Sequence, residues 1–242
     1  ACNICSFNLA ELCATTVALM KDEHHDIAAT MPAPDFVGGG QILYDEAQMR
    51  EIYEKGRGSV KVRAKYNTVP GENMVEITQI PPTTTVEAIM DKIAELVKAG
   101  KLKEISDMRD ETDLNGLKLT LDLKRGVDAD KLMAKLYKAT PLEDSFSANF
   151  NILVSGQPRV MGVREILQEW TAFRMECVRR RTWYDLHGKE KRLHLLKGLA
   201  AILLDIDKAI HIIRTTEEET EVVPNLMIGF GIDEVQADYV AE

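Results

Sequence analysis

The residues best suited to chemistry are concentrated in one short basic segment, Tyr53–Tyr66, with the sequence YEKGRGSVKVRAKY. Side chains alternate along a β-strand, so this segment would carry valines on one face and Lys61, Arg63 and Lys65 on the other. Cations spaced by about 6.6 Å, two strand residues each, can follow the phosphates of a nucleic-acid backbone. Such contacts position a duplex without reading its bases. The alternative is a solvated edge strand, on which lysine prevents aggregation.

The charge of the chain is unevenly distributed. The formal net charge is -9, which argues against wholesale binding to nucleic acid. Residues 50–66, however, hold six cations and two acids, and residues 174–197 hold eight cations and three acids. Ten acids and two cations lie between residues 205 and 242. The acidic total therefore reflects the C-terminal end and says little about a surface formed by residues 50–66.

Three other groups of residues could form a ligand site, but each has a simpler explanation. Gly38–Gly40 lacks both the Lys-Ser/Thr and the preceding strand of a phosphate-binding loop. His24 and His25 are adjacent, and adjacent side chains rarely reach one metal ion. The acids of DMRDETD, residues 107–113, could hold magnesium, but acids interleaved with an arginine more often form a charged loop. No serine, cysteine or histidine has neighbours that suggest a nucleophile with its base.

The composition is that of a globular protein, with 45% hydrophobic and 29% charged residues. No apolar run approaches the roughly 20 residues that cross a bilayer, and the first residues show no signal-peptide core. We therefore expect four reduced cysteines and a cytoplasmic location. The absence of an initiator methionine predicts an internal piece of a longer chain.

The elements that must position the basic segment are expected to form an α+β domain over residues 1–160. The basic strand and residues 75–79 are predicted to pair as a hairpin. Further strands are expected at residues 103–108, 117–124 and 146–154, and helices at residues 9–21, 45–54, 85–99 and from Asp128 to before Thr140. We expect a mixed or antiparallel sheet with the helices on one side.

Residues 161–242 have a different, helical character. Apolar residues recur at helical spacing from Val163 to Val178 and again from Leu193 to Ile213. Because Gly188 lies between the two runs, we predict two helices of about 25 residues joined by a tight turn, which is an antiparallel coiled-coil hairpin.

Several phrases, taken together and in order, match a known family. They include EKGRGSVKVRAKY, VEITQIPPTTTVEAIMDKIAELVKAGKLKEISDMRDETD, LYKATPLEDSFSANFNILVSGQPRVMGVREIL and FRMECVRRRTWYDLHGKEKRLHLLKGL. The chain resembles the A subunit of a bacterial type IIA DNA topoisomerase, either DNA gyrase or DNA topoisomerase IV. The resemblance implies that residues 1–160 form the family's tower domain. It also implies that residues 161–242 form its coiled coil and the start of its C-terminal dimer gate.

The same resemblance implies an activity and partners for the whole protein. The family changes DNA topology by ATP-dependent passage of one duplex through a transient double-strand break in another. Its partners are double-stranded DNA, the B subunit of the topoisomerase, which binds ATP and Mg²⁺, and a second copy of the A subunit. We expect no cofactor, metal or membrane contact for this part of the chain. The family's cleaving tyrosine lies upstream of Ala1, so none of the six tyrosines inherits that role and this part should be catalytically inactive.

Two kinds of DNA contact follow from the resemblance. The predicted phosphate contacts are Arg57, Lys61, Arg63 and Lys65. Ile4 stands where the family places an isoleucine that wedges between base pairs and bends the DNA. The next three residues are CSF, where the family usually has PPH.

The competing hypothesis is a dimeric scaffold whose helical hairpin binds a protein partner and whose basic strand makes no DNA contact.

Overall fold

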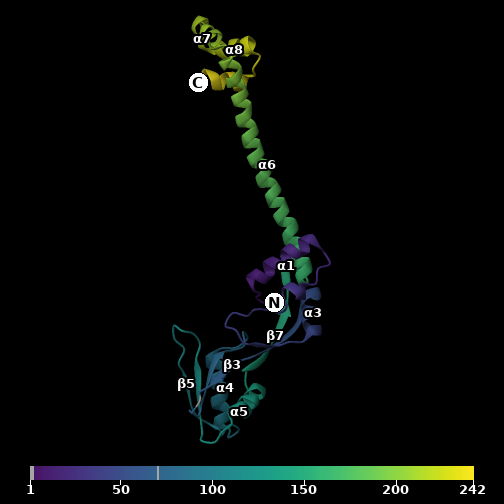
Figure 1. Cartoon of the computed structure of the whole chain (residues 1–242), viewed down its shortest axis with the longest axis vertical. Helices are drawn as coiled ribbons and strands as arrows, with labels where there is room; N and C mark the ends of the chain where they lie inside the picture. The colour runs from purple at the N-terminus through teal and green to yellow at the C-terminus, as the bar shows by residue number, and fades with distance from the viewer. Residues whose placement is uncertain (1–2, 70) are drawn as a thin grey trace. The chain divides into compact units, whose positions relative to one another are not determined.

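A computed structural model describes residues 3–69 and 71–242 (Figure 1). The chain divides into two compact units, with the boundary between residues 171 and 172. All strands of the described residues lie in the first unit, and every strand pair is antiparallel. The expected α+β class is therefore confirmed, with antiparallel sheets in the first unit and a long helix that is consistent with the expected hairpin.

The first unit contains three sheets and five complete helices among its described residues. In chain order its elements are α1 (Leu9–Lys21), α2 (Ile27–Thr30), β1 (Gln41–Leu43), α3 (Glu46–Lys55), β2 (Arg57–Arg63), β3 (Lys65–Thr68), β4 (Met74–Gln79), α4 (Val86–Lys98), β5 (Ile105–Asp110), β6 (Leu119–Leu123), α5 (Ala129–Ala139), β7 (Glu143–Asn149), β8 (Asn151–Val154), β9 (Gln157–Val160) and the beginning of α6 (Val163–Leu203). Two apolar cores divide these elements into two lobes.

The first lobe is built around the three-stranded sheet β1-β2-β7. α1, α2, α3 and the first turns of α6 share one apolar core with this sheet, and its largest fully buried side chains are Met31, Ile52 and Phe150. Side chains cap α1 and α3 at their N-termini. Asn8 accepts from the backbone at the start of α1, and Asp45 does the same for α3. β2 is consequently held in place by an anchored layer of helices.

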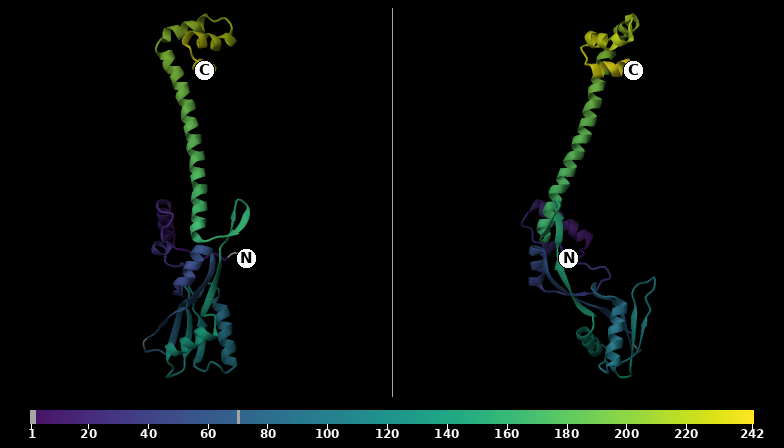
Figure 2. Two further views of the ribbon diagram at one scale, coloured as in Figure 1. Left: turned by 90° about the vertical axis from the view of Figure 1, so that its right-hand side faces the viewer. Right: turned by 180° about the vertical axis from the view of Figure 1, so that it is seen from behind.

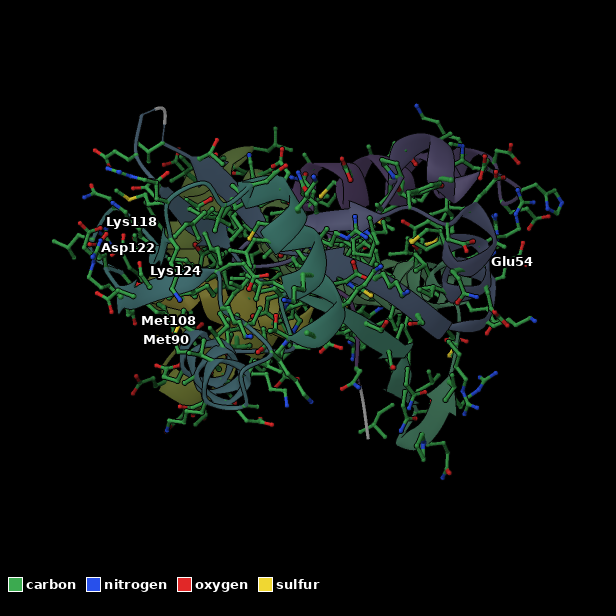
Figure 3. The ribbon with its side chains drawn as sticks, turned by 90° about the horizontal axis from the view of Figure 1, so that it is seen from below. Glu54, Met90, Met108, Lys118, Asp122 and Lys124 are labelled. Carbon is green, nitrogen blue, oxygen red and sulfur yellow. The ribbon has the colours of Figure 1, made fainter. Side chains whose placement is uncertain are left out.

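The second lobe is the four-stranded sheet β3-β4-β6-β5 with α4 and α5 on one of its faces. Alternate residues of β6, namely Leu119, Leu121 and Leu123, are buried in the core shared with these helices. The opposite face is polar. Figure 3 labels Lys118 and Asp122 on this lobe, at the far end of the unit from Glu54 of α3.

The basic segment is not one strand, and this part of the prediction is wrong. β2 ends at Arg63 and pairs with β1 and β7, whereas only β3, which begins at Lys65, pairs with β4. Between them, the amide of Ala64 donates to the carbonyl of Leu142 at 2.7 Å. This bond continues the β2-β7 register by one residue, and the chain enters the other sheet at Lys65, so it changes sheet at Ala64. The predicted strand at 146–154 is likewise divided, at Phe150, into β7 and β8.

The second unit consists of helices (Figures 1 and 2). After α6 come α7 (Ile206–Thr215), the short 3-10 helix η1 (Glu219–Glu221), α8 (Val222–Phe230) and α9 (Glu234–Ala241), which gather around a small apolar core. Asp233 caps α9 in a capping box with Gln236.

The predicted turn at Gly188 is wrong, because α6 continues through this residue as one helix of 41 residues. A glycine inside a helix costs only about 1 kcal/mol relative to alanine, and the good helix formers on either side outweigh that cost. The long helix is consistent with one arm of a hairpin whose turn does not lie at Gly188.

Candidate nucleic-acid interface

β2 carries the predicted basic face at the centre of its sheet. Val60 and Val62 are 3% and 1% exposed and point into the core of the first lobe, as the alternation predicts. Lys61 projects from the other face, where 60% of its side chain is exposed. β2 has a neighbouring strand on each side, β1 and β7. Protection of an edge strand therefore does not explain Lys61 and Arg63, the two cations that lie between β1 and β7.

The strands beside β2 add small polar groups to the same face, because residues directly opposite each other in a sheet share a face. On β7, Ser145 lies opposite Lys61 and Ser147 lies opposite Ser59. On β1, Gln41 lies opposite Arg63. Hydroxyl and amide groups are common partners of phosphate oxygens, so this basic face has the composition of a phosphate-binding surface.

Glu143 is the carboxylate that β7 contributes to the basic face. It lies opposite Arg63 in the register, and its side chain is only 17% exposed. The Arg63 guanidinium donates to one of its oxygens, while the Lys61 Nζ lies 4.0 Å from the other. The ring of Tyr137 lies below the same guanidinium, 5.0 Å from centroid to Cζ. Arg63 is thus engaged on two sides, and Lys61 is the more available cation.

Lys65 lies on a different sheet from Lys61. It is exposed on β3, an edge strand of the second lobe, where it pairs with Gln79. The structure therefore brings Arg57, Lys61 and Arg63 together on β2 and places Lys65 across the junction between the lobes.

Ile4 lies near the other end of the basic face. Its neighbour Asn3 makes two backbone hydrogen bonds with Asn149, at 2.9 and 2.8 Å. Asn149 is in turn the register partner of Arg57. Ile4 itself is 46% exposed. An exposed apolar side chain and an exposed arginine thus occur at the same end of the sheet.

The other candidates from the sequence have structural partners. His25 contacts the hydroxyl of Thr30 through Nε2 at 2.9 Å. The acids around Arg109 form ion pairs on the polar face of the second lobe, including Arg109 to Asp122 at 2.5 Å. Within residues 3–69 and 71–242, no group of three His, Cys, Asp or Glu side chains is arranged to hold a metal ion.

Tyr53 and Cys5, in the core of the first lobe, are not activated. Burial raises the pKa of Tyr53, whose hydroxyl donates to the Met31 carbonyl at 2.6 Å. Burial also raises the pKa of the Cys5 thiol to about 12. Both groups are held in their neutral, unreactive forms at neutral pH. Cys2 lies outside the described residues.

Sequence reasoning missed Glu143, Ser145 and Ser147. They lie about 80 residues from β2 in the chain, and only the antiparallel β2-β7 register brings them together. The alternation within EDSFSAN was the available signal, because Glu143, Ser145 and Ser147 occupy every second position.

Comparison with known proteins identifies the family of the chain. The family described as the A subunit of DNA gyrase/topoisomerase IV matches residues 1–242. The DNA gyrase A subunit of Synechocystis sp. is 35% identical over 100% of this chain and 29% of its own length. The DNA topoisomerase 4 A subunit of Pseudomonas aeruginosa is 36% identical over 97% of this chain and 31% of its own length. The chloroplastic/mitochondrial DNA gyrase A subunit of Arabidopsis thaliana is 35% identical over 100% of this chain and 26% of its own length.

The chain thus spans between a quarter and a third of the curated relatives it matches. In the part of the chain that the structure describes, every helix is too short or too polar to cross a membrane. The match over the whole chain, together with relatives of both kinds, shows that the chain belongs to the family of DNA gyrase and topoisomerase IV A subunits.

Proposed function

We propose that the first unit is the tower domain in the A subunit of a type II DNA topoisomerase and that its basic face supports a DNA duplex. The observation that carries this proposal is the position of Lys61 on a central strand. It lies beside Ser145 and above a buried apolar layer. A cation in this position makes no contribution to edge protection, and its side chain remains 60% exposed. We assign Arg57, Lys61 and Lys65 as phosphate contacts, with Arg63 as part of the same surface.

In the whole protein, this support serves ATP-dependent passage of one duplex through a transient break in another. The cleaving tyrosine lies in a preceding domain, ATP and Mg²⁺ are bound by the B subunit of the topoisomerase, and a second copy of the A subunit completes the dimer. Tyr53 and Cys5 are buried in their neutral forms, which supports a structural role for these two groups. We accordingly expect no relaxation or cleavage activity from this chain alone.

Binding to a short duplex tests the proposal. We expect the 242-residue chain to bind a fluorescent DNA of about 20 base pairs weakly and without sequence preference. Each phosphate contact contributes about 0.9 to the slope of log K against log salt. Lys61→Gln should therefore reduce affinity roughly fivefold at about 0.15 M salt and lower the slope by about 0.9.

Lys124→Gln is the matched control, because Lys124 is an exposed lysine of the second lobe that lies after β6 and not on the basic face (Figure 3). Its binding should equal that of the wild type. If Lys61→Gln also bound DNA as tightly as the wild type, Lys61 would not be a phosphate contact and the proposal would lose its central residue.

Ile4 is proposed to wedge between base pairs at the Arg57 end of the basic face. Apolar wedges exchange unstacking energy for a bent duplex that contacts more protein surface. Energy transfer between dyes at the two ends of a bound duplex should show a smaller bend with Ile4→Ala than with the wild type. An unchanged bend would leave Ile4 as an ordinary surface residue.

The scaffold hypothesis is favoured by one observation, the exposed aromatic side chains of α6. Phe173, Trp183 and Tyr184 are 63%, 60% and 75% exposed. Exposed aromatic residues of this kind often contact other proteins. Sedimentation distinguishes the hypotheses: DNA support predicts a monomer or a weak dimer, and a tight dimer held by the first unit would favour the scaffold.

A further inference from the structure

The junction between the two lobes of the first unit determines how the basic face is assembled. Lys61 belongs to the sheet of the first lobe and Lys65 to the sheet of the second. The chain crosses from one to the other at Ala64, which is fully buried. The spacing between these two cations therefore depends on whatever holds the lobes in one orientation.

A cluster of three side chains lies at this junction. Tyr137, on α5 of the second lobe, donates from its hydroxyl to the Ala64 carbonyl at 2.8 Å. Its ring lies under the guanidinium of Arg63, on β2 of the first lobe. Arg63 in turn donates to Glu143 of β7. The cluster thus connects one helix of the second lobe with two strands of the first.

The hydroxyl and the ring of Tyr137 have separate roles at this junction. Burial raises its pKa, and the positive charge of Arg63 acts in the opposite direction. The hydroxyl therefore remains a hydrogen-bond donor at neutral pH. A planar guanidinium can stack on an aromatic ring and donate to a carboxylate at the same time, whereas a lysine ammonium cannot reproduce this geometry.

Two further hydrogen bonds cross the junction. The Thr83 hydroxyl donates to the Asp144 carboxylate at 2.5 Å, and the Gly40 amide donates to Oε1 of Gln79 at 2.8 Å. Removing Arg63 should therefore loosen the junction without separating the lobes.

We propose that Arg63 is a positioning residue, whose contacts with Tyr137 and Glu143 fix the junction at Ala64 and so set the spacing between Lys61 and Lys65. This inference rests on the proposed function, because Lys61 and Lys65 are the proposed phosphate contacts. Cations on two rigidly connected sheets bind one duplex together more tightly than cations on two loosely connected sheets. Arg63 acts through this geometry and not through a phosphate of its own.

Arg63→Lys separates the two roles, because it keeps the positive charge and loses the stacked, carboxylate-bound geometry. The first measurement is amide hydrogen exchange of Ala64 in the DNA-free chain, since this amide bonds to Leu142 at the point where the chain passes from one sheet to the other. We expect Arg63→Lys and Tyr137→Phe each to speed this exchange about tenfold, with Lys124→Gln unchanged. Exchange of Leu121, inside the second lobe, should stay unchanged in all of them.

The second measurement is the salt dependence of duplex binding. For Arg63→Lys, we expect affinity to fall about threefold to tenfold at an unchanged slope, because no phosphate contact is lost. Arg63→Gln should behave in the same way. A slope lower by about 0.9 in Arg63→Gln, with normal Ala64 exchange and full rescue by Arg63→Lys, would overturn the inference and make Arg63 a phosphate contact. If the wild type bound no duplex, the proposed function would fail, and Ala64 exchange would still decide whether Arg63 holds the junction.

Discussion

Tyr53 offers a test of the packing that supports β2. It lies on α3, is 4% exposed, and its hydroxyl donates to the carbonyl of Met31, which is fully buried. Tyr53→Phe keeps the ring and removes the donor. Because the Met31 carbonyl would then be buried without this donor, the loss should approach the cost of an unsatisfied buried group, about 1 to 3 kcal/mol.

Calorimetry of the chain measures this effect. A loss of about 2 kcal/mol should lower the Tm of the first unit by roughly 4 to 8 °C, given the size of that unit. Tyr44→Phe is the matched control, because Tyr44 is 55% exposed and its substitution should change stability by less than about 0.5 kcal/mol. If Tyr53→Phe were as stable as Tyr44→Phe, the buried hydrogen bond would contribute nothing and the described core would be wrong.

The loss of stability at alkaline pH is a second test of the same prediction. Because the pKa of Tyr53 is raised in the folded state, ionisation above the ordinary value of 10.0 favours the unfolded chain. The wild type should therefore lose stability as the pH rises above that value. Tyr53→Phe should lose less over the same range.

Three further predictions concern other parts of the first unit. Cys13 is exposed, so a thiol reagent at mildly alkaline pH should modify it within minutes in the folded chain. The buried Cys5 should react only after unfolding, and peptide mapping would distinguish the two sites. Gly162→Ala should prevent stable folding of the first unit, because the added Cβ would clash with the Glu54 carbonyl oxygen. Circular dichroism would show the loss of structure. A folded variant would refute the close contact between α3 and the residue before α6. A hydrogen bond from the Thr120 side chain lowers the pKa of Glu111 below its ordinary 4.5, so the stability that Glu111 contributes should be lost as the pH falls below that value. In Glu111→Gln, the free energy of unfolding should therefore decrease less than in the wild type below that pH. An equal decrease in both proteins would contradict the lowered pKa of Glu111.

Elements with a local signal could be predicted from the sequence. α1 occupies residues 9–21 as predicted, because Asn8 supplies a cap at one end and polar residues follow Lys21. The burial of Val60 and Val62 follows from alternation alone. The start of α5 at Asp128 was also evident from residue type.

Features that depend on distant residues could not be predicted in the same way. At the sheet switch, the Ala64 amide bonds to Leu142, and nothing within Tyr53–Tyr66 indicates that partner. In the sequence, Arg63 and Lys61 are both cations on the same face of the alternating pattern. In the structure, Arg63 differs because its guanidinium contacts Glu143 and the ring of Tyr137. Gly188 was misleading because glycine permits a turn without requiring one.

The salt dependence of duplex binding tests the central claim most directly. With Arg57, Lys61 and Lys65 as contacts, log K should fall with log salt at a slope of about 2.7 in magnitude, which corresponds to roughly a 40-fold loss of affinity between about 50 and 200 mM salt. The variant with all three changed to glutamine should lose nearly all of this dependence. A wild-type slope near zero, or an unchanged slope in the triple variant, would contradict DNA support by the basic face.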